Sequence, residues 1–136
     1  MSEPLHVFLV DDHPFVRLGL RTAIEQHPDF TVVGEADSCA AAIARLPVLH
    51  PDLLVLDLNL GDGNGWTLIE QLREAKALPP TLVLSVCDEA LYAERLLRAG
   101  ARGYLMKNAP SERIVAALRE IHSGQLVVSP AVASRF

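Results

Sequence analysis

The chain has 136 residues, half of them apolar, with a mean hydropathy of +0.24 and a formal net charge of −5. This size and composition predict one domain with a buried core, and the acidic balance argues against a nucleic-acid-binding surface within this segment. Cys39 and Cys87 lack the spacing of a zinc or dithiol site, and the sequence has no signal peptide or membrane-spanning run. We therefore expect a cytoplasmic protein that does not contact the membrane.

Short apolar runs alternate along the chain with longer segments whose apolar residues have helical spacing. The expected strands cover residues 5–10, 30–36, 52–57, 81–86 and 102–106. The expected helices cover residues 14–27, 38–46, 66–77, 88–99 and 110–123. Pro14 suits a first helical turn, Ser38 and Asp88 suit N-caps, and Pro47 marks the end of the second helix. The glycine-rich segment 61–65 is expected to be a loop whose glycines permit left-handed backbone.

The alternation of five strands with five helices predicts a parallel sheet covered by helices on both faces. The expected architecture is a three-layer, doubly wound α/β domain of the flavodoxin-like type with strand order 2-1-3-4-5. This domain is assigned to residues 1–124. Residues 125–136 are interpreted as the start of a linker to a C-terminal output domain that lies outside this chain.

Polar side chains follow the C-terminal ends of four of the expected strands. Asp11 and Asp12 follow the first strand, Asp57 ends the third, Ser85 lies at the end of the fourth, and Lys107 follows the fifth. In an open parallel sheet, ligands bind at this edge, near the point where strand order reverses. Carboxylates, a hydroxyl and an amine meeting there indicate a site for a divalent cation and a phosphoryl group.

These residues, in this order, resemble the receiver domain of bacterial response regulators. The segment Val10-Asp11-Asp12-His13-Pro14 and the segment from Ala99 to Lys107 further resemble the subfamily that carries a C-terminal LuxR-type helix-turn-helix domain. The resemblance covers residues 5–123. It implies a two-component system in which a sensor histidine kinase supplies the phosphoryl group and the missing output domain binds DNA.

The resemblance also implies a role for each site residue. Asp57 is the expected phosphoryl acceptor, and a carboxylate is a competent nucleophile for an aspartyl phosphate. The expected Mg²⁺ ligands are Asp11, Asp12, Asp57 and the backbone carbonyl of Asn59. Lys107 is expected to pair with the phosphoryl oxygens, and Ser85 to donate a hydrogen bond to one of them. Ser85 and Tyr104 form the expected switch, which remodels the surface of the fourth helix, fifth strand and fifth helix and allows homodimers to form.

Two other functions remain open from the residues alone. A stand-alone receiver acting by protein contact would need no output domain. A phosphatase-like enzyme would also use an aspartyl nucleophile, but that class has a second acid two residues later, where this chain has Asn59. We expect no enzyme activity beyond the transfer and loss of the chain's own phosphoryl group.

Three positions depart from the family pattern. Gly61 stands where proline is usual, Val86 where a small residue is usual, and Asn108 where proline often follows the lysine. Because a β-branched side chain beside the site limits access for water, we expect Val86 to prolong the life of the aspartyl phosphate. Whether the bond between Lys107 and Asn108 is cis stays open. The five histidines show no ligand spacing and are interpreted as surface or interface residues.

Overall fold

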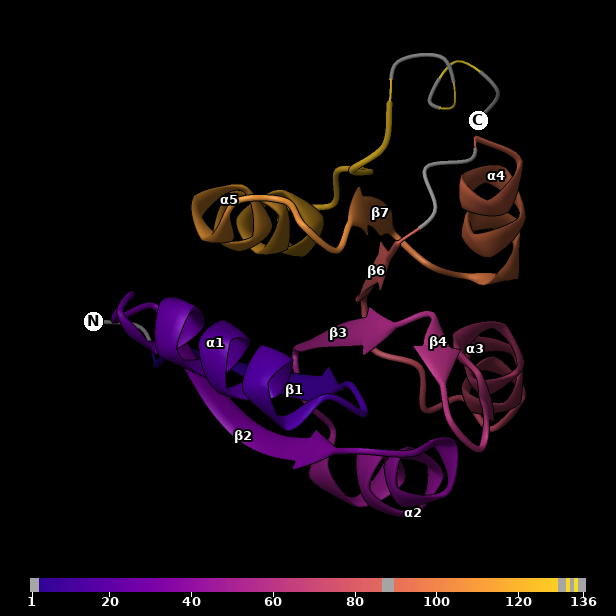
Figure 1. The fold of residues 1–136 in the computed structure, drawn as a ribbon, viewed down its shortest axis with the longest axis horizontal. Coiled ribbons are helices and arrows are strands. Elements are labelled where there is room, and N and C mark those ends of the chain that lie inside the picture. Colours follow the sequence, from indigo (N-terminus) through magenta and orange to yellow (C-terminus); the bar gives the residue numbers. More distant parts are fainter. Residues whose placement is uncertain (1–2, 87–89, 130–131, 133, 135–136) are drawn as a thin grey trace.

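The computed structural model describes residues 3–86, 90–129, 132 and 134. Five parallel strands form the main sheet in the order β2-β1-β3-β6-β7, which is 2-1-3-4-5 along the chain and confirms the expected topology (Figure 1). These strands are β1 (Leu5–Val10), β2 (Phe30–Ala36), β3 (Leu53–Asp57), β6 (Thr81–Ser85) and β7 (Gly103–Met106). The helices are α1 (Pro14–Glu25), α2 (Cys39–Leu49), α3 (Gly65–Glu74), α4 (Ala90–Ala99) and α5 (Ser111–His122).

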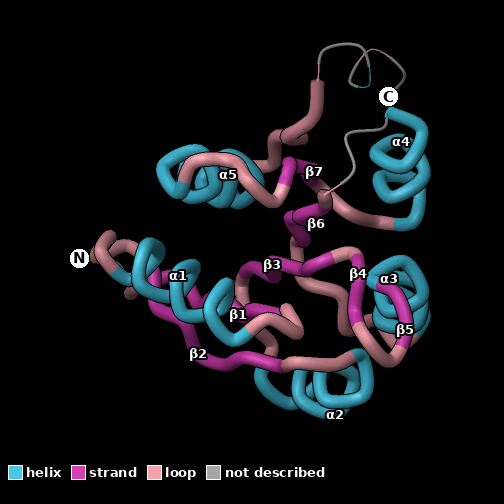
Figure 2. Tube along the Cα trace, in the orientation of Figure 1, coloured by secondary structure: helices cyan, strands magenta, loops and turns pink. Residues whose placement is uncertain are grey.

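Alternating residues of each strand divide the core into two layers. On β1, Val7 and Leu9 pack with α1 and α5, whereas Phe8 and Val10 pack with α2 and α3. Figure 2 shows the same division, with α1 and α5 on one side of the sheet and α2, α3 and α4 on the other. Because both faces are covered, the strands are apolar throughout, which is why the sequence predicted them as continuous apolar runs.

The expected end of the second helix at Pro47 is wrong. Ser38 caps α2 as expected by accepting a hydrogen bond from the amide of Ala41, but the helix continues to Leu49 with Pro47 inside it. Proline removes one helical hydrogen bond, and its cost is highest where the freed carbonyl is buried. Here Ile43, four residues earlier, and Pro47 are both exposed, so water can reach the freed carbonyl.

The segment after β3 differs from the expected loop. It forms a small antiparallel hairpin of β4 (Asn59–Leu60) and β5 (Gly63–Asn64), and α3 begins at Gly65, one residue earlier than expected. The described glycines with left-handed backbone are Gly100 and Gly124, so the left-handed backbone that the glycines of residues 61–65 permit is not adopted there. Gly65 is needed for space instead, because a Cβ atom there would lie 3.1 Å from the carbonyl oxygen of Asp57.

The chain stays on the domain beyond the expected boundary at Gly124. Val127 is buried and forms a parallel bridge with Gly103, and its carbonyl accepts a hydrogen bond of 2.8 Å from the amide of Tyr104. The fourth main strand ends at Ser85, one residue earlier than expected, and the expected cap Asp88 lies outside the described residues. Within the described part of the chain, none of the helices has the length and apolar character needed to cross a membrane.

Candidate functional site

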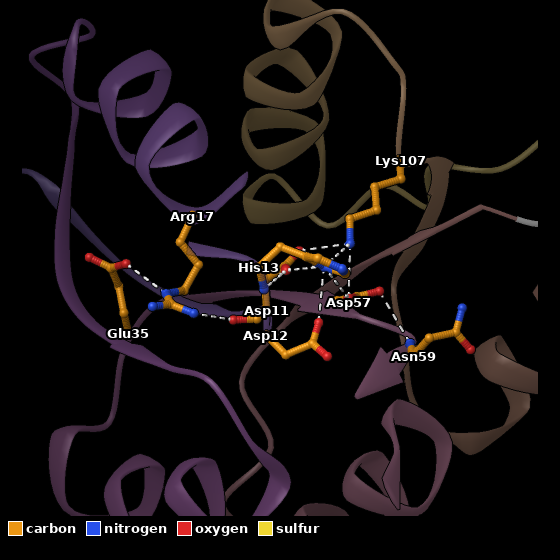
Figure 3. A network of polar contacts seen from close by, with 8 residues as sticks. All are labelled: Asp11, Asp12, His13, Arg17, Glu35, Asp57, Asn59 and Lys107. Atoms are coloured by element: carbon orange, nitrogen blue, oxygen red, sulfur yellow. Dashed lines mark hydrogen bonds and ion pairs between the residues drawn. The ribbon is translucent and has the colours of Figure 1, made fainter. Parts of the chain in front are cut away.

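The strand register brings three acidic residues to one edge of the sheet. Val10 of β1 pairs with Leu56 of β3, so Asp11 and Asp57, which follow them, lie side by side. Asp12 is the next residue of the β1–α1 turn. Ligand atoms of Asp11, Asp12, Asp57 and His13 all lie within 4.8 Å of one another (Figure 3). Asp11 and Asp57 are buried, so bulk water cannot solvate their charges.

Lys107 follows β7 and brings a cation to this cluster. Its Nζ atom donates a hydrogen bond of 3.0 Å to Oδ2 of Asp57 and lies 3.1 Å from Oδ2 of Asp11. Burial works against the charge of Lys107, but its contacts with Asp57 and Asp11 outweigh this effect and raise its pKa. The lysine is therefore held in its charged form beside the carboxylates.

Burial raises the pKa of Asp57 above its usual range. The hydrogen bonds from Lys107 and from the amide of Asn59 lower the pKa, but they offset the effect of burial only in part. The neighbouring charge of Asp11 raises it further. The ionised form of Asp57 is thus costly in this structure, and any additional cation at the site would stabilise it.

Two carboxylate oxygens of the cluster have unmet bonding capacity. Oδ2 of Asp11 and Oδ1 of Asp12 are buried and make no oriented hydrogen bond, although Nζ of Lys107 lies 3.1 Å from the first and Nδ1 of His13 lies 3.0 Å from the second. Carboxylate oxygens are the ligands that Mg²⁺ prefers, and this ion needs few protein ligands because it keeps several waters. The residues present therefore fit a hard divalent cation, and the cluster of Asp11, Asp12 and Asp57 can bind a metal ion.

The other predicted site residues lie around this cluster. Asn59 lies on β4 and donates its amide to Oδ1 of Asp57 at 3.1 Å. Ser85 is buried at the end of β6, and its carbonyl accepts a hydrogen bond of 2.7 Å from the amide of Lys107. Tyr104 on β7 is buried, with 7% of its surface exposed, in the core layer shared with α3 and α4. The bond between Lys107 and Asn108 is trans.

His13 is a site neighbour that sequence reasoning missed. Its Nδ1 atom lies 3.0 Å from Oδ1 of Asp12, 3.1 Å from Oδ1 of Asp11 and 3.2 Å from Nζ of Lys107. The sequence signal for this contact is the position of His13 directly after the acid pair Asp11-Asp12, and not its spacing from the other histidines. The interpretation of His13 as only a surface residue is incomplete, because its exposed ring also reaches the acidic cluster.

Arg17 of α1 is a second neighbour that was missed. Its guanidinium donates from Nη1 to the carbonyl of Asp11 at 2.6 Å and from Nε to Oε1 of Glu35 at 3.2 Å (Figure 3). No sequence signal separates this arginine from an ordinary surface residue of an amphipathic helix.

Val86 lies at the rim of the site. Its side chain is 64% exposed, and together with Val16, Met106, Lys107 and Asn108 it lines a hollow of about 350 Å³. The restriction of water by Val86 stays a prediction.

Comparison with known proteins gives consistent matches along most of the chain. Residues 7–119 match the family described as "Response regulator receiver domain". The chain is 38% identical over 131 residues to the nitrate/nitrite response regulator protein NarL of Escherichia coli (strain K12), covering 96% of this chain and 61% of that relative. It therefore spans less than two thirds of the length of this curated relative.

Two solved structures show the same fold. A LuxR-family two-component response regulator from Aurantimonas sp. SI85-9A1 has 31% identity and a TM-score of 0.88, covering 96% of this chain and 94% of that chain. A structure of two RcsB dimers bound to two parallel DNAs has 27% identity and a TM-score of 0.85, covering 96% of this chain and 66% of that chain.

Proposed function

Because the chain belongs to the response regulator receiver domain family, as a receiver of the NarL and LuxR type, we propose that it is a signalling switch controlled by phosphorylation of Asp57. The observation that carries this proposal is the position of Asp57. Its buried carboxylate lies 3.0 Å from the Lys107 ammonium and within a cluster of three acids. A carboxylate attacking a phosphoryl group needs charge neutralisation and positioning more than proton transfer, and this site supplies both.

The residues around Asp57 have separate proposed roles in phosphoryl transfer. Oδ2 of Asp57 faces Lys107, whose point charge can pair with the oxygens of an attached phosphoryl group. Oδ1 is held by the amide of Asn59, which orients the carboxylate. The hydroxyl of Ser85, at the end of the adjacent strand β6, is proposed to donate to a phosphoryl oxygen once it is attached. The chain acts on its own aspartate and turns over no separate substrate.

Asp11, Asp12, Asp57 and the carbonyl of Asn59 would hold Mg²⁺, which supplies charge neutralisation to the transferring group. The carboxylates of Asp11 and Asp12 each bring one buried oxygen that makes no oriented hydrogen bond. Lys107 balances part of the negative charge of the cluster.

The proposed output is a change in the surface formed by α4, β7 and α5. Ser85 and Tyr104 lie on the neighbouring strands β6 and β7, so a movement of the serine toward a phosphoryl group would change the packing around the tyrosine. The donor would be a sensor histidine kinase, and the chain would meet it in the cytoplasm. Because RcsB is described as forming dimers on DNA, we extend the proposal to homodimers that act through a C-terminal DNA-binding domain, joined by a linker that begins within residues 125–136.

Intact-mass measurement after incubation with Mg²⁺ and acetyl phosphate tests the acceptor. We expect the parent chain to gain one phosphoryl group and the Asp57→Asn variant to gain none, with EDTA abolishing the gain. Asp52→Asn is the matched control, because Asp52 lies just before β3 and accepts a hydrogen bond from the amide of His6, away from the cluster. A folded parent chain without any gain, or a gain that persists in Asp57→Asn, would contradict the proposal.

A further inference from the structure

We propose that Arg17 is a positioning residue of the metal site, acting through the backbone of Asp11. The inference rests on the proposed function, since it concerns how the Mg²⁺ ligands are held. Arg17 lies one turn into α1, its side chain is 19% exposed, and its Nη1 atom donates a hydrogen bond of 2.6 Å to the carbonyl of Asp11. In Figure 3, Arg17 approaches Asp11 from the side of α1, and Lys107 approaches the cluster from the other side.

Each polar atom of Asp11 except one is already held. Its amide donates 3.1 Å to the carbonyl of Ala36, its Oδ1 accepts 2.7 Å from the amide of His13, and its carbonyl accepts from Arg17. The remaining atom, Oδ2, makes no oriented hydrogen bond but forms an ion pair of 3.1 Å with Nζ of Lys107. Three bonds to three different segments thus orient the residue so that one buried oxygen is presented to a cation.

Of these three hydrogen bonds, the one accepted by the carbonyl of Asp11 comes from a side chain, that of Arg17, whereas backbone amides donate the other two. Removing Arg17 would leave the Asp11 carbonyl without this donor, in a residue that is 1% exposed. The peptide between Asp11 and Asp12 would then reorient toward another donor, since a buried polar group without a partner is costly. Because that peptide joins two of the expected ligands, both carboxylates would lose their common orientation.

The charge of Arg17 works in the opposite direction, because a cation near the cluster weakens the binding of another cation. Glu35 on β2 accepts from Nε of Arg17 at 3.2 Å and also pairs with Arg21 at 2.7 Å, so its one carboxylate offsets only part of the charge of the two arginines. Loss of Arg17 would therefore lower the local positive charge and by itself favour a bound cation, so a weaker affinity reports the lost orientation of Asp11. Groups that orient metal ligands without touching the metal typically change its affinity 10- to 100-fold.

Arg21 provides a matched control on the same helix. Its Nη2 atom lies 2.7 Å from Oε2 of Glu35, so it shares the same carboxylate, but the hydrogen bond to Asp11 comes from Arg17. Arg17→Met and Arg21→Met each remove one arginine from Glu35 while keeping the apolar stem and the helix propensity. Only the first also removes the bond to the carbonyl of Asp11.

Isothermal titration calorimetry of the 136-residue chain with Mg²⁺ alone measures the effect directly. We expect Arg17→Met to raise the Mg²⁺ dissociation constant about tenfold or more. Arg21→Met should leave it within about twofold, because exposed ion pairs contribute little. Arg17→Lys should lie between, because an ammonium cannot bridge two acceptors as a planar guanidinium does. Urea unfolding in EDTA shows whether each variant is folded and how much stability it has lost.

A purely structural role predicts a different result. An unchanged dissociation constant in a folded Arg17→Met variant, or an equal rise in Arg21→Met, would overturn the inference. If Arg17→Met does not fold, an unchanged dissociation constant in Arg17→Lys overturns it in the same way. Failure of the parent chain itself to bind Mg²⁺ would contradict the proposed function, which distinguishes the two failures.

Discussion

Asp57 ends β3 and Asp62 lies between β4 and β5, five residues later, yet their carboxylates have opposite surroundings. Asp57 is buried, and burial raises its pKa despite hydrogen bonds from Lys107 and the amide of Asn59. Asp62 is exposed and accepts hydrogen bonds from the amides of Cys39 and Ala40 at the start of α2, which lower its pKa. The second carboxylate is already satisfied by the protein, whereas the first gains from any further cation.

This contrast separates a site from a structural contact. Hydrogen-bond donors at a helix N-terminus stabilise a carboxylate without a ligand, and Asp62 ties the β4–β5 hairpin to α2 in this way. Asp57 lies among acids whose negative charge is balanced only in part by Lys107, and two of their buried oxygens make no oriented hydrogen bond, so a further cation would stabilise the cluster. The acid with the less favourable surroundings is therefore the better candidate for chemistry.

Removal of the cation beside Asp57 should give the largest effect. We expect Lys107→Met to slow phosphorylation by acetyl phosphate about 100-fold, because preorganised charge at a transferring phosphoryl group is worth this much in comparable sites. Lys76→Met is the matched control, since Lys76 is the other lysine of the chain and lies on the surface after α3. The rate of mass gain with Mg²⁺ measures both variants. Equal rates in Lys107→Met and Lys76→Met would remove Lys107 from the proposed site.

Glycine substitutions should distinguish the two parts of the β3–α3 connection. A Cβ atom at Gly65 would lie 3.1 Å from the carbonyl of Asp57 and from Cα of Leu58, which are backbone atoms that cannot easily move. We expect Gly65→Ala to lower the free energy of unfolding by about 1–3 kcal/mol. At Gly61 a Cβ atom would meet only Oδ2 of Asp12, at 3.8 Å.

Gly61→Ala should instead raise the free energy of unfolding by about 0.4–1 kcal/mol, because it restricts the unfolded chain at a position without left-handed backbone. Urea unfolding of both variants in EDTA checks the difference in sign. An equal fall in the free energy of unfolding for Gly61→Ala and Gly65→Ala would mean that close packing is not confined to Gly65, beside Asp57 of β3.

Charge removal should change stability in opposite directions at the two acids. Because the pKa of Asp57 is raised in the folded state, its ionisation opposes folding, and we expect Asp57→Asn to raise the Tm at pH 7 in EDTA. Asp62→Asn should lower the Tm, because its pKa is lowered by amide donors that favour the charged form. Thermal unfolding of the two variants and the parent at pH 7 measures both changes.

The pH dependence of the stability difference between Asp57→Asn and the parent is an independent test of whether the charge of Asp57 opposes folding. As pH rises from below about 3.9, the ordinary value for aspartate, the unfolded chain ionises Asp57 before the folded chain does, so the parent loses stability relative to Asp57→Asn. The advantage of Asp57→Asn should therefore be complete above the raised folded-state pKa and vanish below about pH 3.9. An advantage that stays constant across this range would show that packing, and not charge, is its cause.

The order of strands and the convergence of the site acids follow from the sequence for a physical reason. Buried parallel strands must be apolar, so a carboxylate at a strand end stands out, and parallel register then brings Asp11 beside Asp57. The hairpin of β4 and β5 could not be predicted, because two-residue strands carry no periodicity. Val127 packs where Gly103 lacks a side chain. This contact joins residues far apart in the sequence, so local sequence patterns do not predict it.

The contacts of His13 and Arg17 were missed because they depend on side-chain direction. A histidine before a helix and an arginine in its first turns are ordinary in sequence, and it is the folded β1–α1 turn that directs both residues toward Asp11. Sequence reasoning therefore identifies the residues that carry charge to the site more readily than those that orient them.

Val86→Ala should give the smallest effect of these variants, on the lifetime of the phosphorylated state rather than on its formation. Val86 and Lys107 line the same mostly apolar hollow, and we expect truncation of Val86 to ease the approach of water to the phosphoryl group beside Lys107 without removing a charge. We expect dephosphorylation to accelerate by about 2- to 5-fold, which corresponds to less than about 1 kcal/mol in the barrier. Decay of the phosphorylated mass after removal of acetyl phosphate measures this rate.

Val48→Ala is the control, since Val48 is 78% exposed on α2 and lines no part of the hollow. A decay rate in Val86→Ala equal to that of the parent would show that residues other than Val86 set the access of water to Asp57.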